Sequence, residues 1–133
     1  MPKEVVRPEQ LAKPAGFSHG IKTRGGTTVY LAGQVAFDAA GGVVGRGDLV
    51  RQFDQVLSNL KAVVEQAGGA MTDIVKLTLF ITDMADYKAK LRPIGEVYRN
   101  HFGRHYPAMT AVEIKRLFDD GCLIEIEGVA VID

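Results

Sequence analysis

A periodic apolar stripe over residues 49–67 constrains the fold of this chain more than any other feature. Its apolar residues recur at three- and four-residue spacing, as on one face of an α-helix: Leu49, Phe53, Val56, Leu57, Leu60, Val63, Val64 and Ala67. Asp48 is a candidate N-cap before the stripe, and Gly68 and Gly69 are a C-terminal stop after it. Because a helix with one apolar face must bury that face, we expect this helix to lie on a β-sheet.

The run of residues 73–82 predicts a strand of that sheet. Successive side chains of a strand point to opposite faces, which places Val75, Leu77, Leu79 and Ile81 on one face and Ile74, Lys76, Thr78 and Phe80 on the other. This pattern is typical of a strand that a helix covers on one side.

Four further runs have the composition or alternation of strands: residues 17–23, 27–36, 108–116 and 122–132. The first two are separated by the sequence RGG, whose glycines permit a tight turn, so we expect them to form a hairpin. Residues 83–103 again have helical spacing, but Pro93 lies inside them. A bent helix, or a short turn followed by a helix near residues 92–102, is therefore expected.

The resulting order is two strands, a helix, a strand, a helix and two strands. It predicts one α+β domain over residues 1–133, with both helices on one face of a mixed sheet. The opposite face would then carry apolar residues from several strands with no helix to cover them. A chain that exposes such a patch usually associates, so we expect a homo-oligomer.

Charge and cysteine content limit the partners and the compartment. The chain has 16 basic and 16 acidic residues, which leaves no positive field for a phosphate backbone, and we expect no nucleic-acid partner. It lacks a run of about 18 apolar residues and a secretory pattern at the N-terminus, so we expect no membrane association. A single cysteine, Cys122, excludes an internal disulfide and fits a reducing, cytoplasmic compartment.

Glu125 lies in the middle of an otherwise apolar predicted strand. An ionised carboxylate in such a strand needs a partner or a raised pKa. It could act as a general acid or base, or orient a water molecule, in a pocket at an oligomer interface. It could instead form a cross-strand ion pair with Lys76, Lys115 or Arg116, and the sequence leaves both interpretations open.

The histidines and the cysteine favour structural roles. His101 and His105 are four positions apart, but Gly103 falls between them and no third ligand has matching spacing, so we expect no metal site. His19 is interpreted as a hydrogen-bonded residue of a strand, with a role as a base held in reserve. Acidic neighbours of Cys122 disfavour an activated thiolate.

Six motifs of the chain are similar to those of one known family and occur in the same order: FSHGIKT, VYLAGQVAFD, NLKAVVEQAGG, TDIVKLTLFITDMADY, PAMTAVEI and LIEIEGVAV. Over nearly its whole length the chain resembles the reactive intermediate deaminase (Rid) family, known also as YjgF or endoribonuclease L-PSP. The resemblance implies a chorismate-mutase-like α+β fold and a homotrimer, whose sheets line a central barrel and whose three pockets lie at the subunit clefts. It also implies hydrolysis of imines and enamines, such as 2-aminoacrylate, without a cofactor.

The resemblance further implies which residues face the ligand. In the PAR motif of the family an arginine binds the substrate carboxylate, and Met109 stands at that position here. A thioether cannot pair with a carboxylate and fills apolar space instead. Loss of a buried charged hydrogen bond costs about 3 kcal/mol of binding, so we expect poor turnover of 2-aminoacrylate.

Other matched positions have also lost polar groups: Phe17 for a tyrosine, Ala32 for a serine, Gly95 for an asparagine and Ala111 for a cysteine. What the chain keeps is Glu125, at the position of the glutamate that positions water in the family, together with the backbone of Gly33 and the side chain of Gln34. The expected pocket is therefore more apolar than that of a typical deaminase and has one carboxylate.

Two functions fit such a pocket. The first is a hydrolase that acts without a cofactor or metal on a small imine or enamine, with Glu125 as the general base and with the substrate against Phe17, Ala32, Gly33, Gln34, Met109 and Ala111. The second is a ligand-binding or regulatory trimer without catalysis. We favour the hydrolase because Glu125 is retained, whereas a ribonuclease finds no basic groove here. Arg104, Lys115 or a charge from a neighbouring subunit would supply a new anion anchor if it pointed into the cleft.

Overall fold

The structure, a computed structural model, describes residues 3–133. Its elements are, in chain order, β1 (Lys3–Val6), β2 (Gly20–Thr23), β3 (Thr27–Gln34), α1 (Leu49–Gln66), the short 3-10 helix η1 (Met71–Asp73), β4 (Ile74–Ile81), α2 (Met84–Ala89), α3 (Leu91–Phe102), β5 (Ala108–Glu113) and β6 (Ile124–Ile132). The helix predicted over residues 49–67 is α1, and the strands predicted over residues 73–82, 108–116 and 122–132 are β4, β5 and β6.

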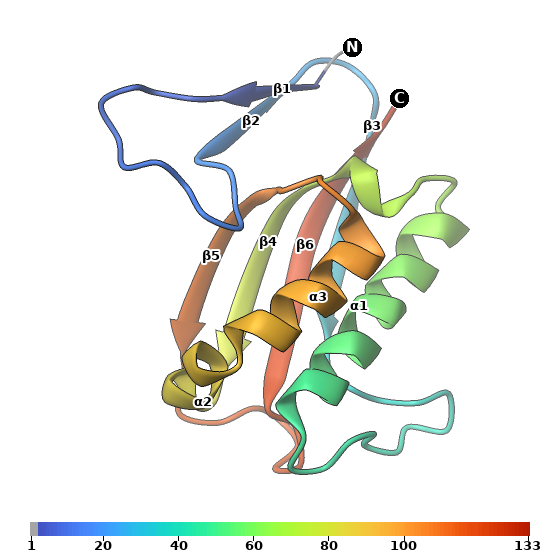
Figure 1. Ribbon diagram of the computed structural model, residues 1–133. Coiled ribbons are helices and arrows are strands. Elements are labelled where there is room, and N and C mark those ends of the chain that lie inside the picture. The colour runs from blue at the N-terminus through green and yellow to red at the C-terminus, as the bar shows by residue number, and fades with distance from the viewer. Residues whose placement is uncertain (1–2) are drawn as a thin grey trace.

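Four strands form the main sheet, in the order β3-β6-β4-β5. Strand β6 is antiparallel to both β3 and β4, whereas β5 runs parallel to β4 at the edge of the sheet. In Figure 1 the helices α1 and α3 lie across one face of this sheet, and no helix of residues 3–133 covers the other face. The predicted α+β fold with a mixed sheet and helices on one face is confirmed.

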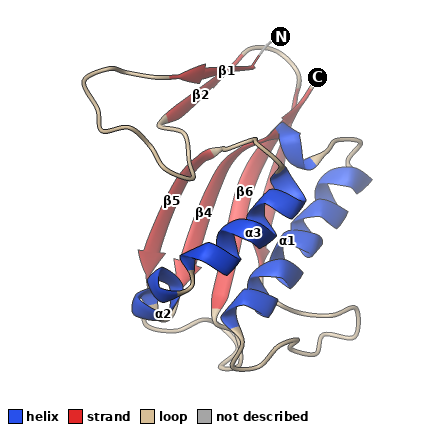
Figure 2. Ribbon diagram, in the orientation of Figure 1, coloured by secondary structure: helices blue, strands red, loops and turns tan. Residues whose placement is uncertain are grey.

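Helix α1 supplies much of the core between the two layers. Asp48 caps it, because its side chain accepts a hydrogen bond of 3.1 Å from the backbone N–H of Arg51. The apolar stripe of α1 faces the sheet, as Figure 2 shows for the two layers, and meets buried residues of the two central strands: Leu77, Leu79, Ile81, Ile124, Ile126 and Ala130. The packing that the stripe predicted is therefore present.

One buried polar side chain of α1 joins two loops. Gln52 is fully buried, and its amide nitrogen donates to the carbonyl oxygens of Gly45 and Gly121 at 3.2 and 2.9 Å. Its amide oxygen accepts from the backbone N–H of Leu123 at 2.8 Å. All its hydrogen-bonding groups thus have partners, which removes the cost of burying an amide and fixes the loop that precedes β6.

The two faces of β4 differ at one position from the prediction. Leu77, Leu79 and Ile81 face the helices, as expected, but Ile74 is also fully buried in the core. The pairing of β4 with β6 shifts register between Ile74 and Lys76, which breaks the strict alternation there. The assignment of Ile74 to the uncovered face was therefore wrong.

The predicted hairpin of residues 17–23 and 27–36 is also wrong. Strand β2 pairs with β1 in a separate two-stranded sheet, and within residues 3–133 it has no pairing with β3. The chain before β2 is instead tied to the start of β5, since Ser18 donates its backbone N–H to Pro107 and its hydroxyl to the carbonyl of Tyr106. Gly25 and Gly26 have positive φ angles, 68° and 75°, and turn the chain between the two sheets rather than within one.

The second helical region is divided into α2 and α3 at Lys90: α3 agrees with the helix expected near residues 92–102, but the expected short turn before it is the six-residue helix α2. Pro93 is the third residue of α3. In the first turn of a helix the backbone N–H groups have no acceptor within the helix, so a proline is tolerated there. None of the helices in the described part of the chain has the length and apolar character of a membrane span.

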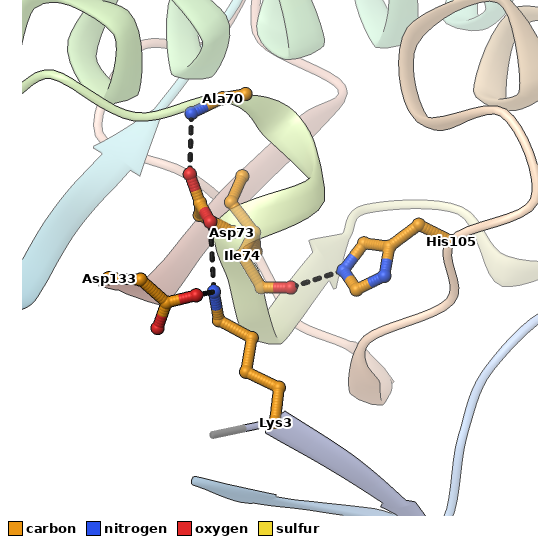
Figure 3. Close-up of polar contacts among 6 residues, drawn as sticks. All are labelled: Lys3, Ala70, Asp73, Ile74, His105 and Asp133. Atoms are coloured by element: carbon orange, nitrogen blue, oxygen red, sulfur yellow. Dashed lines mark hydrogen bonds and ion pairs between the residues drawn. The ribbon is translucent and has the colours of Figure 1, made fainter. Parts of the chain in front are cut away.

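An ion-pair cluster holds β1 against the main body. The ammonium of Lys3 lies 2.8 Å from a carboxylate oxygen of Asp73 and 3.7 Å from one of Asp133, and Figure 3 shows these contacts. Asp73 also accepts the backbone N–H of Ala70 at 2.8 Å. Burial opposes ionisation of Asp73, but Lys3 and the Ala70 N–H outweigh it and hold the pKa of the carboxyl below its ordinary value of 3.8.

The variant Asp73→Asn should lower the free energy of unfolding at neutral pH by about 1 kcal/mol, because the ion pair is lost. A carboxyl whose pKa is lower in the folded state adds stability above its unfolded pKa, and that stability disappears as the pH falls through the folded pKa. The difference from the parent should therefore begin to shrink near the ordinary value of 3.8 and vanish only below the lowered pKa of the folded carboxyl. Urea unfolding over a pH series measures this, with the exposed Asp120→Asn as control. Equal stability at neutral pH, or a difference that persists in acid, would contradict the assignment.

Candidate functional site

A cavity of about 470 Å³ lies between α3 and the sheet, on the face that the helices cover. Its volume is that of a typical small-molecule site. Its walls come from β4, β5, β6, the three α-helices and the loop before β2: Ala15, Gly16, Phe17, Phe53, Leu57, Leu77, Leu79, Tyr87, Leu91, Ile94, Gly95, Tyr98, Arg99, Tyr106, Met109, Ala111 and Ile126. The lining is mostly apolar and carries a single charged side chain.

The parallel pairing of β5 with β4 brings Met109 and Ala111 to this cavity. Met109 is opposite Leu77 and Ala111 is opposite Leu79. Leu77 and Leu79 are only 1% and 2% exposed and face the helices, so their neighbours on β5 face the same side. The cavity floor is therefore apolar where the resemblance implies that other Rid proteins carry an arginine and a cysteine.

Two residues from distant parts of the chain complete this wall. Phe17 lines the cavity because the hydrogen bonds of Ser18 to Tyr106 and Pro107 hold the loop before β2 against the start of β5. Gly95 lines it from the middle of α3. Of the residues that the sequence placed against the ligand, Phe17, Met109 and Ala111 line this cavity, and the matched position Gly95 lines it with them.

Aromatic residues form the far wall. The ring of Tyr98 stacks on Phe102 and Tyr106, with centroids 4.5 and 5.3 Å apart, and its hydroxyl donates to the carbonyl of His105 at 2.7 Å. Burial raises the pKa of Tyr98 and of Tyr87, so both hydroxyls stay neutral. This wall is therefore aromatic and carries no charge, and the one proton of the Tyr98 hydroxyl is already donated to His105.

Arg99 is the charged residue of the lining, and the sequence analysis did not single it out. Its guanidinium lies over Gly95, one helical turn before it, and Nη1 is 3.2 Å from the place that a β-carbon on Gly95 would occupy. Within residues 3–133 its side chain forms no ion pair and no hydrogen bond. Arg104 and Lys115, the anchors considered from the sequence, are exposed as Arg99 is, but unlike Arg99 they are not among the cavity residues.

Glu125 lies on the opposite face of the sheet. It pairs with Phe80 of β4, whose side chain points away from the helices, and it is half-buried. Its carboxylate rests against Gly33, where a β-carbon would be 2.8 Å from Cδ, so only glycine leaves room for it. Ala32 is exposed and Gln34 half-buried in the same strand, β3. One chain therefore separates Glu125, Ala32, Gly33 and Gln34 from the cavity of Met109.

The hypothetical ion pair of Glu125 is not formed in the described part of the chain. The Lys76 ammonium donates to the carbonyl of Leu77 and to the hydroxyl of Thr110, at 3.3 and 3.2 Å. Lys115 and Arg116 are exposed. The salt bridges of residues 3–133 do not include Glu125, which leaves its carboxylate available on the uncovered face of the sheet.

Each histidine has a partner of its own. His101 lies 2.6 Å from a carboxylate oxygen of Asp54, whereas a ring nitrogen of His105 lies 2.6 Å from the carbonyl of Ile74. His19 contacts the carbonyl of Ala12 at 2.7 Å. The described residues contain no group of three metal-ligating side chains. These contacts agree with structural roles for the three side chains.

Comparison with known proteins connects this chain to a family. Residues 8–132 match the family described as endoribonuclease L-PSP. A RutC family protein of Pyrococcus horikoshii is 43% identical over 129 residues, covering 96% of this chain and 97% of the relative. A protein of Dermatophagoides farinae named 2-iminobutanoate/2-iminopropanoate deaminase is 31% identical over 133 residues, covering 99% and 98% of the two chains.

Among solved structures, the fold is similar to that of YyfB from Yersinia pestis, described as a protein of unknown function of the conserved Rid protein family. The TM-score is 0.89 at 34% identity, and the alignment covers 99% of this chain and all of the other. Sequence and fold thus lead to the same group of proteins.

The reactivity of the Cys122 thiol tests the environment around Glu125. The side chain is 2% exposed, and burial raises the pKa of its thiol, which the carboxylates of Asp119 and Glu125 raise further and Arg46 only partly offsets. A raised pKa lowers the thiolate fraction, and the thiolate is the reactive form.

Cys122 of the folded protein should therefore react with iodoacetamide at least about tenfold more slowly than an ordinary thiol. Mass spectrometry follows the modification, with glutathione in the same solution as reference and with the urea-unfolded protein as positive control. Alkylation of the folded protein at the rate of glutathione would show that the thiol is neither buried nor surrounded by carboxylates.

Proposed function

This chain belongs to the Rid family, also named YjgF or endoribonuclease L-PSP, and we propose that it is a hydrolase that converts a small imine or enamine to a ketone and ammonia without a cofactor. The name of the Dermatophagoides farinae relative, an iminobutanoate and iminopropanoate deaminase, supports this reaction class. The reacting ligand would lie in the cavity lined by Met109, Ala111 and Phe17, with Glu125 as the general base.

The structural support for the proposal is that Glu125 and the cavity of the same chain lie on opposite faces of the sheet. Met109 faces the helices and Glu125 faces away from them, with the sheet between them. A single chain cannot bring the two together without breaking the sheet. A second copy can, if its uncovered sheet face meets the rim of the first copy at β5. The site is therefore incomplete without a neighbouring subunit.

A homotrimer meets this requirement with three identical sites. In a closed ring each subunit gives its cavity to one neighbour and its Glu125 to the other. The uncovered face carries Tyr30, 80% exposed, and Val112, 38% exposed, which an interface would bury. The close approach of the Gly33 backbone to Glu125 keeps that carboxylate oriented on the face that such a neighbour would meet.

The reaction needs only a base, water and a place for the ligand. As the Glu125 carboxylate takes a proton from water, the water oxygen forms a bond to the imine carbon and the imine nitrogen takes up a proton from solvent. In the resulting carbinolamine the protonated Glu125 gives its proton to the amino nitrogen, the carbon–nitrogen bond breaks to release ammonia, and the hydroxyl loses its proton to solvent to leave the ketone. The apolar floor of Met109, Leu77 and Leu79 excludes bulk water from the rest of the ligand.

The proposal is tested first by solution mass. Light scattering should give three times the chain mass of 14.4 kDa. A monomer would remove the neighbour that the site requires and so contradict the proposal.

Activity is measured with an amino-acid oxidase that produces imines and with semicarbazide as the trap. The protein should speed the loss of imine for apolar amino acids, and Glu125→Gln should abolish this effect, because an amide cannot accept the proton of water. If no imine decays faster with the protein present, the chain is a ligand-binding trimer and not a hydrolase.

Mixed trimers show whether Glu125 acts on the neighbouring cavity. Ala111→Trp should fill the cavity and inactivate the protein while leaving Glu125 intact. Co-refolding equal amounts of Ala111→Trp and Glu125→Gln should restore about a quarter of the parent activity, because a random ring pairs an intact cavity with an intact neighbouring carboxylate at that frequency. Each variant alone, refolded in the same way, is the control. No recovery from mixed trimers of normal mass would place both groups in one chain.

A further inference from the structure

We infer that Arg99 is the carboxylate anchor of this cavity and that it binds a monocarboxylate ligand whose body is apolar and of branched-chain or aromatic size. This inference deepens the proposed function and rests on it for the reaction, while the binding itself is measured separately. It assigns the acid-binding role to helix α3, whereas the motif resemblance would place it on β5 at the position of Met109.

The charge of the cavity lining favours Arg99 as the anchor. Arg99 is the one charged side chain among the cavity residues, so the described lining has a net positive charge and contains no carboxylate. Its guanidinium makes no ion pair within residues 3–133, which leaves its donors available. A guanidinium with free donors at the rim of an apolar cavity is suited to a carboxylate, which it binds with two parallel hydrogen bonds.

The space beside Gly95 also favours Arg99, because it accommodates the guanidinium. Gly95 and Arg99 lie four residues apart on α3 and therefore on the same helical face. The guanidinium nitrogen Nη1 lies 3.2 Å from the place of a Gly95 β-carbon, a contact tighter than side chains ordinarily accept. A larger residue at position 95 would move the guanidinium. Glycine in a helix interior is otherwise destabilising, and the space beside it here is occupied by the Arg99 guanidinium.

The shape of the cavity sets the ligand. With the acid group at Arg99, the remainder of the ligand faces Leu77, Leu79 and Met109 of the floor. An acid of three carbon atoms would leave most of the 470 Å³ unfilled. A second anionic group would be buried against apolar side chains without a partner, because Arg99 is the only cation of residues 3–133 that lines the cavity. The geometry thus selects an apolar monocarboxylate over a dicarboxylate or a three-carbon acid.

Calorimetric titration with stable 2-oxo acids tests this without any turnover. The parent protein should bind 4-methyl-2-oxopentanoate and phenylpyruvate more tightly than pyruvate, and more tightly than phenylpyruvamide, which lacks the charge. Arg99→Met should weaken binding of both larger acids by about 10- to 100-fold, the loss of a charged hydrogen bond, and leave the amide unchanged. The affinity of Arg99→Lys for the larger acids should lie between that of the parent and that of Arg99→Met, because an ammonium lacks the planar pair of donors.

Two further variants distinguish loss of the Arg99 carboxylate anchor from a general effect of changing the charge or the sequence of α3. Arg92→Met removes the same charge from the same helix outside the cavity lining and should bind as the parent does. Gly95→Ala should weaken acid binding by displacing the guanidinium, although alanine favours the helix. Light scattering and circular dichroism confirm that each variant keeps its assembly and fold.

Several results would overturn the inference: no binding of the larger acids by the parent, equal binding of acid and amide, or parent-like affinity in Arg99→Met. Its failure is distinct from failure of the proposed hydrolase. Imine hydrolysis that needs Glu125 but not Arg99 would leave the function and remove the anchor. Acid binding that needs Arg99 in a protein that hydrolyses no imine would leave the anchor and remove the function.

Discussion

The register between the two parallel strands β4 and β5 determines where the chemistry of this protein can occur. Leu77 is paired with Met109, and side chains of paired residues point to the same face. Since Leu77 is buried under the helices, Met109 and Ala111 must open toward the space between sheet and helices. The same alternation on β6 turns Glu125 to the other face. A shift of one residue in either strand would exchange the faces and destroy both the core and the cavity.

The fold was largely predictable because its main elements carry strong periodic patterns. The stripe of α1 and the alternation of β4 each fix an element and the face that it buries. The hairpin of β2 and β3 was predicted from local turn chemistry, which describes only that a turn is possible. The chain before β2 is held instead by hydrogen bonds of Ser18 to Tyr106 and Pro107. These residues are distant in the sequence, so no local pattern could predict the contacts. Likewise, the register shift after Ile74 arises from pairing with β6.

The candidate site was predictable where the motifs carried it and not where the chain departs from them. Phe17, Met109 and Ala111 of the predicted set line one cavity, but Glu125 of the same chain lies on the opposite face of the sheet. Arg99 was missed because on the sequence it is one of several exposed basic residues of a helix. A signal was present, since a glycine in the middle of a helix, four residues before an arginine, is an unfavourable choice without a packing reason. Only the coordinates reveal that reason.

The residues at positions 95, 99 and 109 are best understood together. With methionine on β5 the floor of the cavity has no cation, and a carboxylate placed there would be desolvated without compensation. A cation on α3 would instead hold the acid from the helix side of the cavity and leave the floor free for apolar contacts. In that geometry the acid of the ligand lies at Arg99 and its apolar body lies against Leu77, Leu79 and Met109. Glycine at position 95 gives the guanidinium room for this placement, because a β-carbon there would lie 3.2 Å from Nη1.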